Sequence, residues 1–171
     1  ELLNKLISLN LSDGNFSRAK TYLMRLLTIE PHNSTARVLL GDVYLELDQK
    51  EFAAVEYERV LNLNPDNAPL RYKLAELYIW NQNNDRALEH IEQLVLDDIY
   101  NEIYFDKLIA LTENYDPEKA VKFYRYRLKF AGNDPQIRQR LMQQYITMGF
   151  TEEAIDQLKI LVKQNPDNIE Y

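Results

Sequence analysis

The side chains that could do chemistry are scattered through this sequence and form no catalytic or metal-binding pattern. Its two histidines, His32 and His90, have no second histidine and no cysteine at a ligand spacing, so we predict no metal site. Neighbouring carboxylates such as those of Glu152 and Glu153 point in different directions around a helix, which disfavours paired acid–base catalysis. No phosphate-binding loop, nucleophile elbow or HExxH motif is present. We therefore predict a protein that is not an enzyme and binds no cofactor.

One segment does gather charge of a single sign. Residues 117–140 carry seven basic and two acidic side chains, although the whole chain has a net charge of −7. Helical spacing places Lys122, Arg125 and Lys129 on one face, with aromatic residues between them. Such a basic patch can bind nucleic acid or an anionic polymer, and it also suits the solvated outer face of a helix. Because the chain as a whole repels phosphate backbones, we expect no nucleic-acid partner.

The composition is that of a helical protein. The 171 residues are 46% hydrophobic and 27% charged, with only four glycines. The lack of cysteine removes disulfide and thiolate chemistry and leaves the cytoplasm and the periplasm open as locations. No apolar run is long enough to insert into a membrane. Since the first residue is Glu1 and not methionine, we expect the chain to be a segment of a longer protein.

The positions that would organise such helices recur along the whole chain. An alanine returns at gaps of 34, 34, 33 and 34 residues, at Ala19, Ala53, Ala87, Ala120 and Ala154. Prolines at 31, 65 and 166 share one phase of the same period. The spacing predicts five two-helix repeats at about 1–33, 34–67, 68–101, 102–134 and 135–168, with the opening of a sixth at 168–171.

Residues 34–67 show the pattern most completely. They read Arg37, Leu40, Gly41, Tyr44, Ala53, Tyr57 and Pro65. This segment resembles a tetratricopeptide repeat, whose pattern is W-x2-L-G-x2-Y, then A-x3-F, then P; arginine replaces the tryptophan and tyrosine the phenylalanine. The resemblance covers essentially the whole chain. It implies an all-α fold, a single right-handed α-solenoid of helix-turn-helix repeats.

The fourth repeat departs most from the pattern. It is one residue short, and the deletion is most easily placed near residues 114–116. Thr112 replaces the expected tyrosine, and Arg127 stands at a normally apolar position. The pairs Asp116-Pro117 and Asp134-Pro135 nevertheless predict clear helix starts, because each sets a capping carboxylate before a proline.

The resemblance implies a concave groove, lined by the first helix of each repeat, that receives a peptide or helix of a partner protein. The variable positions facing this groove are Asp42, Glu46, Tyr72, Glu76, Trp80, Asp106 and Gln143. Acidic and aromatic side chains suit a partner with basic and apolar residues, although the same residues also suit solvated helix faces. Basic side chains recur at one groove-side position, Lys73, Lys107 and Arg140, but the carboxylate clamp of the family is not predicted.

The predicted function is therefore a protein-interaction scaffold. An alternative is a section of a bacterial cell-envelope assembly, such as an exopolysaccharide export machine. An RNA-binding helical repeat is disfavoured by the overall acidity and by the 34-residue period. The last hairpin is expected to expose apolar surface, so uncapped terminal repeats could associate end to end.

Overall fold

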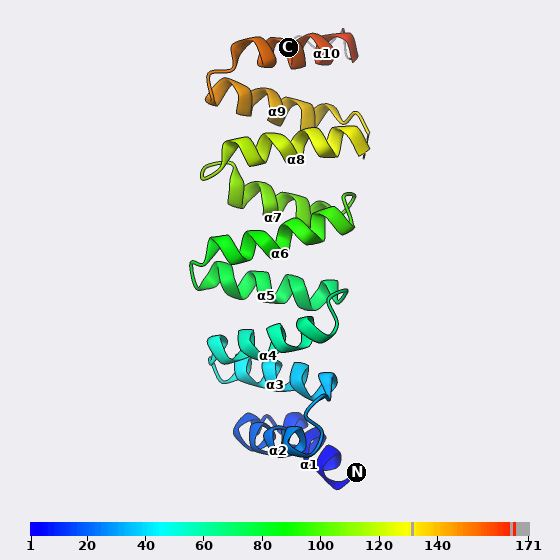
Figure 1. Cartoon of the computed structure of the whole chain (residues 1–171), viewed down its shortest axis with the longest axis vertical. Helices are drawn as coiled ribbons and strands as arrows, with labels where there is room; N and C mark the ends of the chain where they lie inside the picture. Colours follow the sequence, from blue (N-terminus) through cyan, green and yellow to red (C-terminus); the bar gives the residue numbers. More distant parts are fainter. Residues whose placement is uncertain (131, 165, 167–171) are drawn as a thin grey trace. The chain divides into compact units, whose positions relative to one another are not determined.

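The computed structural model describes residues 1–130, 132–164 and 166, and this part of the chain is helical with no strand. Ten helices follow one another here: α1 (Leu2–Ser12), α2 (Phe16–Ile29), α3 (Ser34–Glu46), α4 (Lys50–Leu63), α5 (Ala68–Trp80), α6 (Asn84–Asp97), α7 (Glu102–Thr112), α8 (Pro117–Phe130), α9 (Pro135–Thr147) and α10 (Thr151–Gln164) (Figure 1). The fold is the predicted all-α solenoid of helix-turn-helix repeats. The predicted start of a sixth repeat at 168–171 lies outside the described residues.

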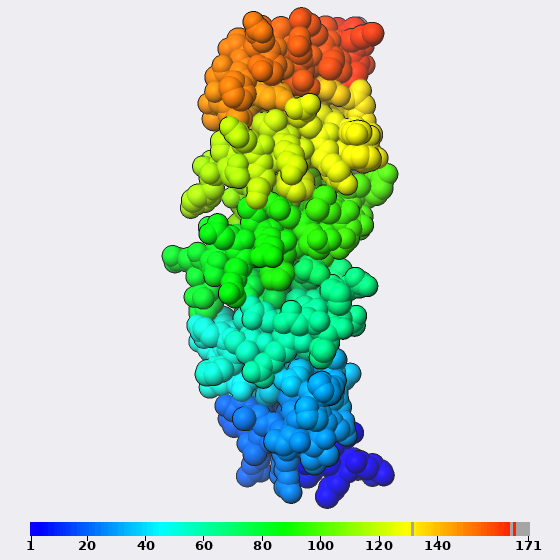
Figure 2. All heavy atoms as spheres, viewed as in Figure 1, coloured from blue at the N-terminus to red at the C-terminus, as the bar shows by residue number. Residues whose placement is uncertain are grey.

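The chain divides into two compact units, Glu1–His90 and Ile91–Tyr171. Within the first unit the helices from α1 to α4 each pack against the next one in the chain, up to α5. Within the second unit the same holds from α7 to α10. The space-filling view shows the colours of α1 to α5 following one another in chain order along the first unit (Figure 2). Within each of these two runs of helices, neighbours in sequence thus cover one another, as repeats of this size require.

The first helix of four repeats begins with a capping side chain at the same phase. The side-chain oxygens of Asn33, Asn67, Asn101 and Asp134 each accept a hydrogen bond from a backbone N–H in the first helical turn. Asp116 caps α8 in the same way, with 3.0 Å between its Oδ1 and the N–H of Lys119. The two predicted Asp-Pro helix starts are therefore confirmed, and asparagine does the same work where proline does not follow directly.

The recurring alanines lie where the helices cross. Four of the five are fully buried, and Ala154 is 5% exposed. Close approach is greatest at Gly41 of α3, where an added methyl group would meet the ring of the buried Tyr57, with its Cδ1 atom at 2.8 Å. Gly41 thus allows the close approach of α3 to Tyr57, as predicted, and the burial of the alanines is consistent with the same role.

A partly buried arginine, Arg37, connects the elements of the second repeat. The Nη1 atom of Arg37 donates to Oε2 of Glu56 at 2.8 Å, and Nη2 donates to the carbonyl of Pro31 at 2.7 Å. Arg71 repeats the second bond one period later, to the carbonyl of Pro65 at 2.5 Å. The arginine that replaces the family's tryptophan therefore joins the first helix to the second helix and to the preceding loop.

The fourth repeat is rebuilt around its deletion. Its first helix, α7, has 11 residues, whereas α5 has 13, and it ends at Thr112 just before the segment where the deletion was placed. Thr112 is fully buried and donates its hydroxyl to the carbonyl of Leu108 at 2.9 Å. Arg127, at the normally apolar position, is only 8% exposed. The two unusual residues of this repeat, Thr112 and Arg127, are therefore both part of its interior.

Candidate protein-binding site

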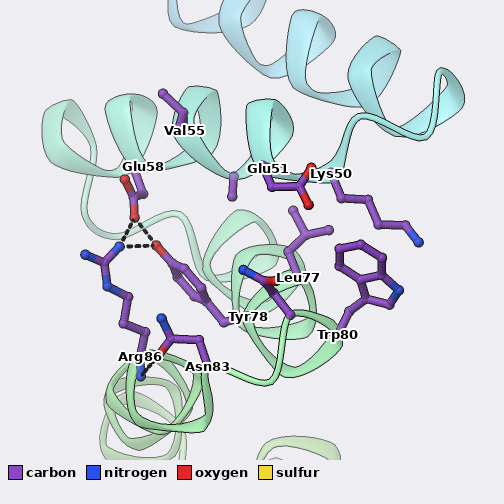
Figure 3. Close-up of a pocket in the computed structure, with 11 residues that line it drawn as sticks. Lys50, Glu51, Val55, Glu58, Leu77, Tyr78, Trp80, Asn83 and Arg86 are labelled. Atoms are coloured by element: carbon purple, nitrogen blue, oxygen red, sulfur yellow. Dashed lines mark hydrogen bonds and ion pairs between the residues drawn. The ribbon is translucent and has the colours of Figure 1, made fainter.

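A hollow of about 200 Å³ lies between α4 and the hairpin of α5 and α6 (Figure 3). Its apolar lining residues include Ala54 and Leu77. Trp80 and Lys50 form one end, and Tyr78, Glu58 and Arg86 form the other. Apolar lining residues with polar groups around them are the usual construction of a site that holds a side chain of a partner.

Trp80 is held at the mouth of this hollow but is not buried. It is the last residue of α5, and its side chain is 53% exposed. The ammonium group of Lys50, the first residue of α4, lies 3.9 Å from the centroid of the indole ring. The chain turns directly after Trp80, with a positive φ of 57° at Gln82. A cation–π contact therefore fixes one face of the ring while the rest of the side chain stays accessible.

The opposite end of the hollow is a closed polar network. Nη1 of Arg86 lies 2.9 Å from Oε1 of Glu58 and 3.0 Å from the hydroxyl of Tyr78, which itself donates to Glu58. The ring of Tyr78 stacks on His90 with a centroid distance of 5.6 Å. Burial, and then the charge of Arg71, lower the pKa of His90, so this imidazole is neutral at pH 7. The His90 ring is partly buried against Tyr78.

The predicted groove residues of the first unit do not form one site with this hollow. Trp80 lines it, whereas Asp42 on α3 accepts hydrogen bonds from the hydroxyl of Tyr57 at 2.6 Å and from the ammonium of Lys73 at 2.9 Å. Glu46 and Glu76 are exposed and Tyr72 is half-buried. The carboxylate of Asp42 is thus already neutralised, and Lys73 is occupied as well, so neither is an open charge for a ligand.

In the second unit, Asp106 and Arg140 pair with each other at 3.1 Å, and Gln143 is exposed on α9. Asp106 and Arg140 also line a smaller cavity of about 100 Å³, together with the buried Arg127. The recurring basic position predicted from sequence therefore carries an ion pair at both Lys73 and Arg140. These pairs link one repeat to the next and leave no anion site at those two positions.

The three residues of the basic patch, Lys122, Arg125 and Lys129, are all exposed on α8. The ammonium of Lys129 lies 5.0 Å from the centroid of the Phe130 ring. Neighbouring cations are not part of this surface, because Lys119 pairs with Glu92 at 2.6 Å and Arg127 is buried. The basic patch therefore consists of these three residues, and its binding of an anionic partner stays a prediction.

The described residues contain no cluster of three or more histidine or acidic side chains arranged to hold a metal ion. Among the same residues, none of the helices combines the length and the apolar character needed to cross a bilayer.

Sequence reasoning missed the partners of Trp80. Lys50, which contacts Trp80, and Glu58, at the other end of the hollow, belong to α4, the second helix of the preceding repeat, whereas the expected groove is built from first helices. The available signal was the period itself: Trp80 ends its helix, so its side chain reaches the turn that begins the second helix of the neighbouring repeat.

Comparison with known proteins agrees with this architecture. Family models described as tetratricopeptide repeat match residues 34–67 and 51–98. Tetratricopeptide repeat protein 21B of Mus musculus is 30% identical over 91 residues, and that of Homo sapiens is 31% identical over 98 residues. These matches cover 53% and 56% of this chain and 7% of each relative, so the chain spans a small part of their length.

Solved structures with the same fold cover nearly the whole chain. A crystal structure of MamA gives a TM-score of 0.62 at 16% identity, covering 99% of this chain and 93% of that one. YrrB, described as a tetratricopeptide repeat protein with an unusual peptide-binding site, gives 0.60 at 17% identity, covering 95% and 84%. A tetratricopeptide repeat protein from Parabacteroides merdae gives 0.59 at 19% identity, covering 95% and 64%. At these identities the likeness shows the fold alone.

Residues 34–98 of the chain therefore match the tetratricopeptide repeat family. The ten helices of the chain, counted over the described residues, fit about five repeats.

Proposed function

We propose that this chain is a non-enzymatic protein-interaction scaffold whose Trp80 hollow receives an apolar or aromatic side chain of a partner peptide. The observation that carries the proposal is the half-exposed Trp80 ring at the mouth of an apolar hollow, fixed by Lys50 at 3.9 Å. Tryptophan is enriched among the residues that dominate binding energy when a partner covers it.

The charges around the hollow favour a neutral anchor. Lys50 and Arg86 are balanced by Glu51 and Glu58, and Arg86 is already bonded to Glu58 at 2.9 Å. A charged anchor would lose its hydration without gaining an open counter-charge in the hollow. Glu51 is exposed at the rim, where a basic residue next to the anchor would meet a carboxylate. The proposed partner thus keeps the predicted apolar and basic character but meets the chain at a different place.

The fold makes peptide binding a reasonable role for this surface. YrrB, which shares the fold, is described as having an unusual peptide-binding site, so a peptide-binding site occurs within the same architecture. In this proposal the whole chain acts as one solenoid domain, as its continuous repeat pattern predicts.

Trp80 is the only tryptophan of the chain, so its own fluorescence can test the proposal. Peptides selected from a random phage-displayed library on the wild-type protein should change the Trp80 emission as they bind. Labelled copies of the same peptides should bind Trp80→Ala at least about tenfold more weakly by fluorescence anisotropy, the loss typical of a hot-spot residue.

Tyr115→Ala is the matched control, because Tyr115 is an aromatic residue that is 80% exposed and lies elsewhere. It should bind the selected peptides as the wild type does. Equal affinity of the peptides for wild type and Trp80→Ala, with both folded by circular dichroism, would show that the hollow is not the binding site.

A further inference from the structure

Three positive charges form a row on the solvent-facing side of α8. Lys122, Arg125 and Lys129 are exposed there, and the helix separates the first from the last by about 10 Å. Among the described residues, none of these three side chains has a carboxylate within ion-pair distance. Helical spacing places the exposed Glu118 one turn before Lys122, so the row of positive charge ends at Lys122. The basic patch is therefore short and open to solvent.

The basic side chains around this patch are already paired or buried. Lys119 pairs with Glu92 at 2.6 Å, and Arg140 pairs with Asp106 at 3.1 Å. Arg127 is buried. Beyond the patch, the chain as a whole has a net charge of −7 and an isoelectric point of about 4.9. A long polyanion would extend into this negative field, whereas a short anionic segment would meet the patch alone.

Exposed aromatic side chains lie at one end of the basic patch. The ring of Phe130 is 49% exposed, its centroid is 4.6 Å from that of Tyr126, and the ammonium of Lys129 is 5.0 Å from it. The hydroxyl of Tyr100, a residue that is 67% exposed, donates to the carbonyl of Phe130 at 3.1 Å. A ligand lying along α8 thus meets three cations and then apolar surface.

We propose that the basic patch is a docking surface for a short acidic segment of a partner protein, in which an apolar residue follows the acidic ones and covers Phe130. Clusters of basic side chains are a recurring means of recognising acidic peptide motifs, and complementary charge favours this pairing. Proteins that bind nucleic acid without sequence specificity have isoelectric points above about 9, so the acidity of this chain favours a polypeptide over RNA. The patch belongs to the second unit, and the proposal does not depend on the Trp80 hollow of the first.

A short acidic peptide tests the patch without a known partner. The probe is a labelled peptide of alternating glutamate and aspartate residues followed by phenylalanine, measured by fluorescence anisotropy at low ionic strength. We expect saturable binding that weakens as salt is added, because the charges are exposed. A neutral peptide with glutamine and asparagine in place of the acids should not saturate. An oligouridylate of the same charge should bind more weakly than the acidic peptide.

Reversing the charge of the patch should remove most of this binding. The variant Lys122→Glu/Arg125→Glu/Lys129→Glu should bind the acidic peptide at least about tenfold more weakly, because like charges then face each other. Phe130→Ala should weaken the binding by a smaller factor, because it removes apolar contact and leaves the three cations in place.

The variant Arg18→Glu/Arg25→Glu/Lys163→Glu is the matched control, because it changes the net charge equally at exposed residues of α2 and α10. It should bind the acidic peptide within about threefold of the wild type, with every variant folded by circular dichroism. The proposal is overturned if the acidic peptide does not saturate, if the neutral peptide binds as tightly, or if the α8 variant loses no more affinity than the control. Tighter binding of the oligouridylate would assign the patch to nucleic acid and overturn it as well. Equal affinity of Phe130→Ala and the wild type would contradict the apolar contact.

Discussion

Two largely buried arginines, one in each compact unit, show two uses of the same side chain. Arg37 in the second repeat has a 2.8 Å bond to Glu56 and a 2.7 Å bond to the carbonyl of Pro31. Arg127 in the fourth repeat has a carboxylate 3.7 Å away and a buried Nη1 without a partner. Their side chains are similarly buried, at 16% and 10% exposed. Arg37 is fully part of an internal hydrogen-bond network, whereas Arg127 leaves a buried donor unpaired. The exposed fraction of the side chain alone does not distinguish these two cases.

Arg37→Met should give the largest effect. It leaves the carboxylate of Glu56, whose side chain is 10% exposed, without its shortest bond, and we expect a loss of about 3–5 kcal/mol in the free energy of unfolding. Urea unfolding followed by circular dichroism measures it. The double variant Arg37→Met/Glu56→Leu should recover most of the loss, since it removes both charges. Equal instability of the single and double variants would contradict the role of the ion pair.

Arg127→Leu should change stability in the opposite direction. Replacing a poorly paired buried charge by an apolar residue of suitable size should raise the free energy of unfolding by about 1–4 kcal/mol. Arg125→Leu, on the exposed face of α8, should change it by less than about 0.5 kcal/mol. A loss of stability like that of Arg37→Met would make the two arginines equivalent and remove the contrast.

Gly41→Ala tests a second difference between these repeats. The new methyl group would meet the buried ring of Tyr57, so we expect a loss of about 1–3 kcal/mol. The fourth repeat holds the bulky Ile109 at the same position, 3% exposed, and Ile109→Val should cost about 0.5–1.5 kcal/mol by removing a methyl group. Thermal or urea unfolding that shows Gly41→Ala to be as stable as the wild type would mean that the crossing is not tight.

The second and fourth repeats share one feature, a buried tyrosine whose hydroxyl donates a hydrogen bond to a carboxylate. Tyr57 donates to Asp42 at 2.6 Å and Tyr124 donates to Glu113 at 2.5 Å. Burial first, and then the carboxylate, raise the pKa of both phenols well above the ordinary value of 10.0. A phenol with a raised pKa stabilises the fold fully below pH 10, and this contribution falls above pH 10 as the unfolded chain loses its proton.

At pH 11 each tyrosine should therefore lower the free energy of unfolding by about 1.4 kcal/mol relative to neutral pH. Unfolding measured from pH 8 to 11 should show a smaller decline in Tyr124→Phe than in the wild type. The control Tyr115→Phe changes a residue that is 80% exposed and should leave the decline as it is. An unchanged slope in Tyr124→Phe would contradict the assignment.

The fold could be predicted from sequence because residues with the same packing role recur at the same positions of each repeat. The alanines at 19, 53, 87 and 120 are fully buried, and helices begin at the predicted Asp-Pro pairs. Even Arg127 stands out in the sequence, because the other repeats have leucine or valine at the same position. Positions that recur are constrained by local helix contacts, and a period is enough to find them.

The site was harder to predict because its contacts do not recur. The period places Asp42 on the groove side of α3. The structure adds that the carboxylate of Asp42 already accepts hydrogen bonds from the Tyr57 hydroxyl and the Lys73 ammonium group. Trp80 was recognised as a candidate, yet its partner Lys50 lies 30 positions earlier on a second helix. Long side chains reach across repeat boundaries, and their rotamers depend on neighbours that spacing does not specify.

The capping side chains of Asn33, Asn67, Asn101 and Asp134 have a consequence for how the chain responds to damage. Each of these repeats carries its own start signal, so a hairpin that has opened can begin to re-form at its own cap, against a neighbour that is still folded. We therefore expect one hairpin to open and close reversibly while its neighbours stay folded, in contrast to a globular core that opens all at once.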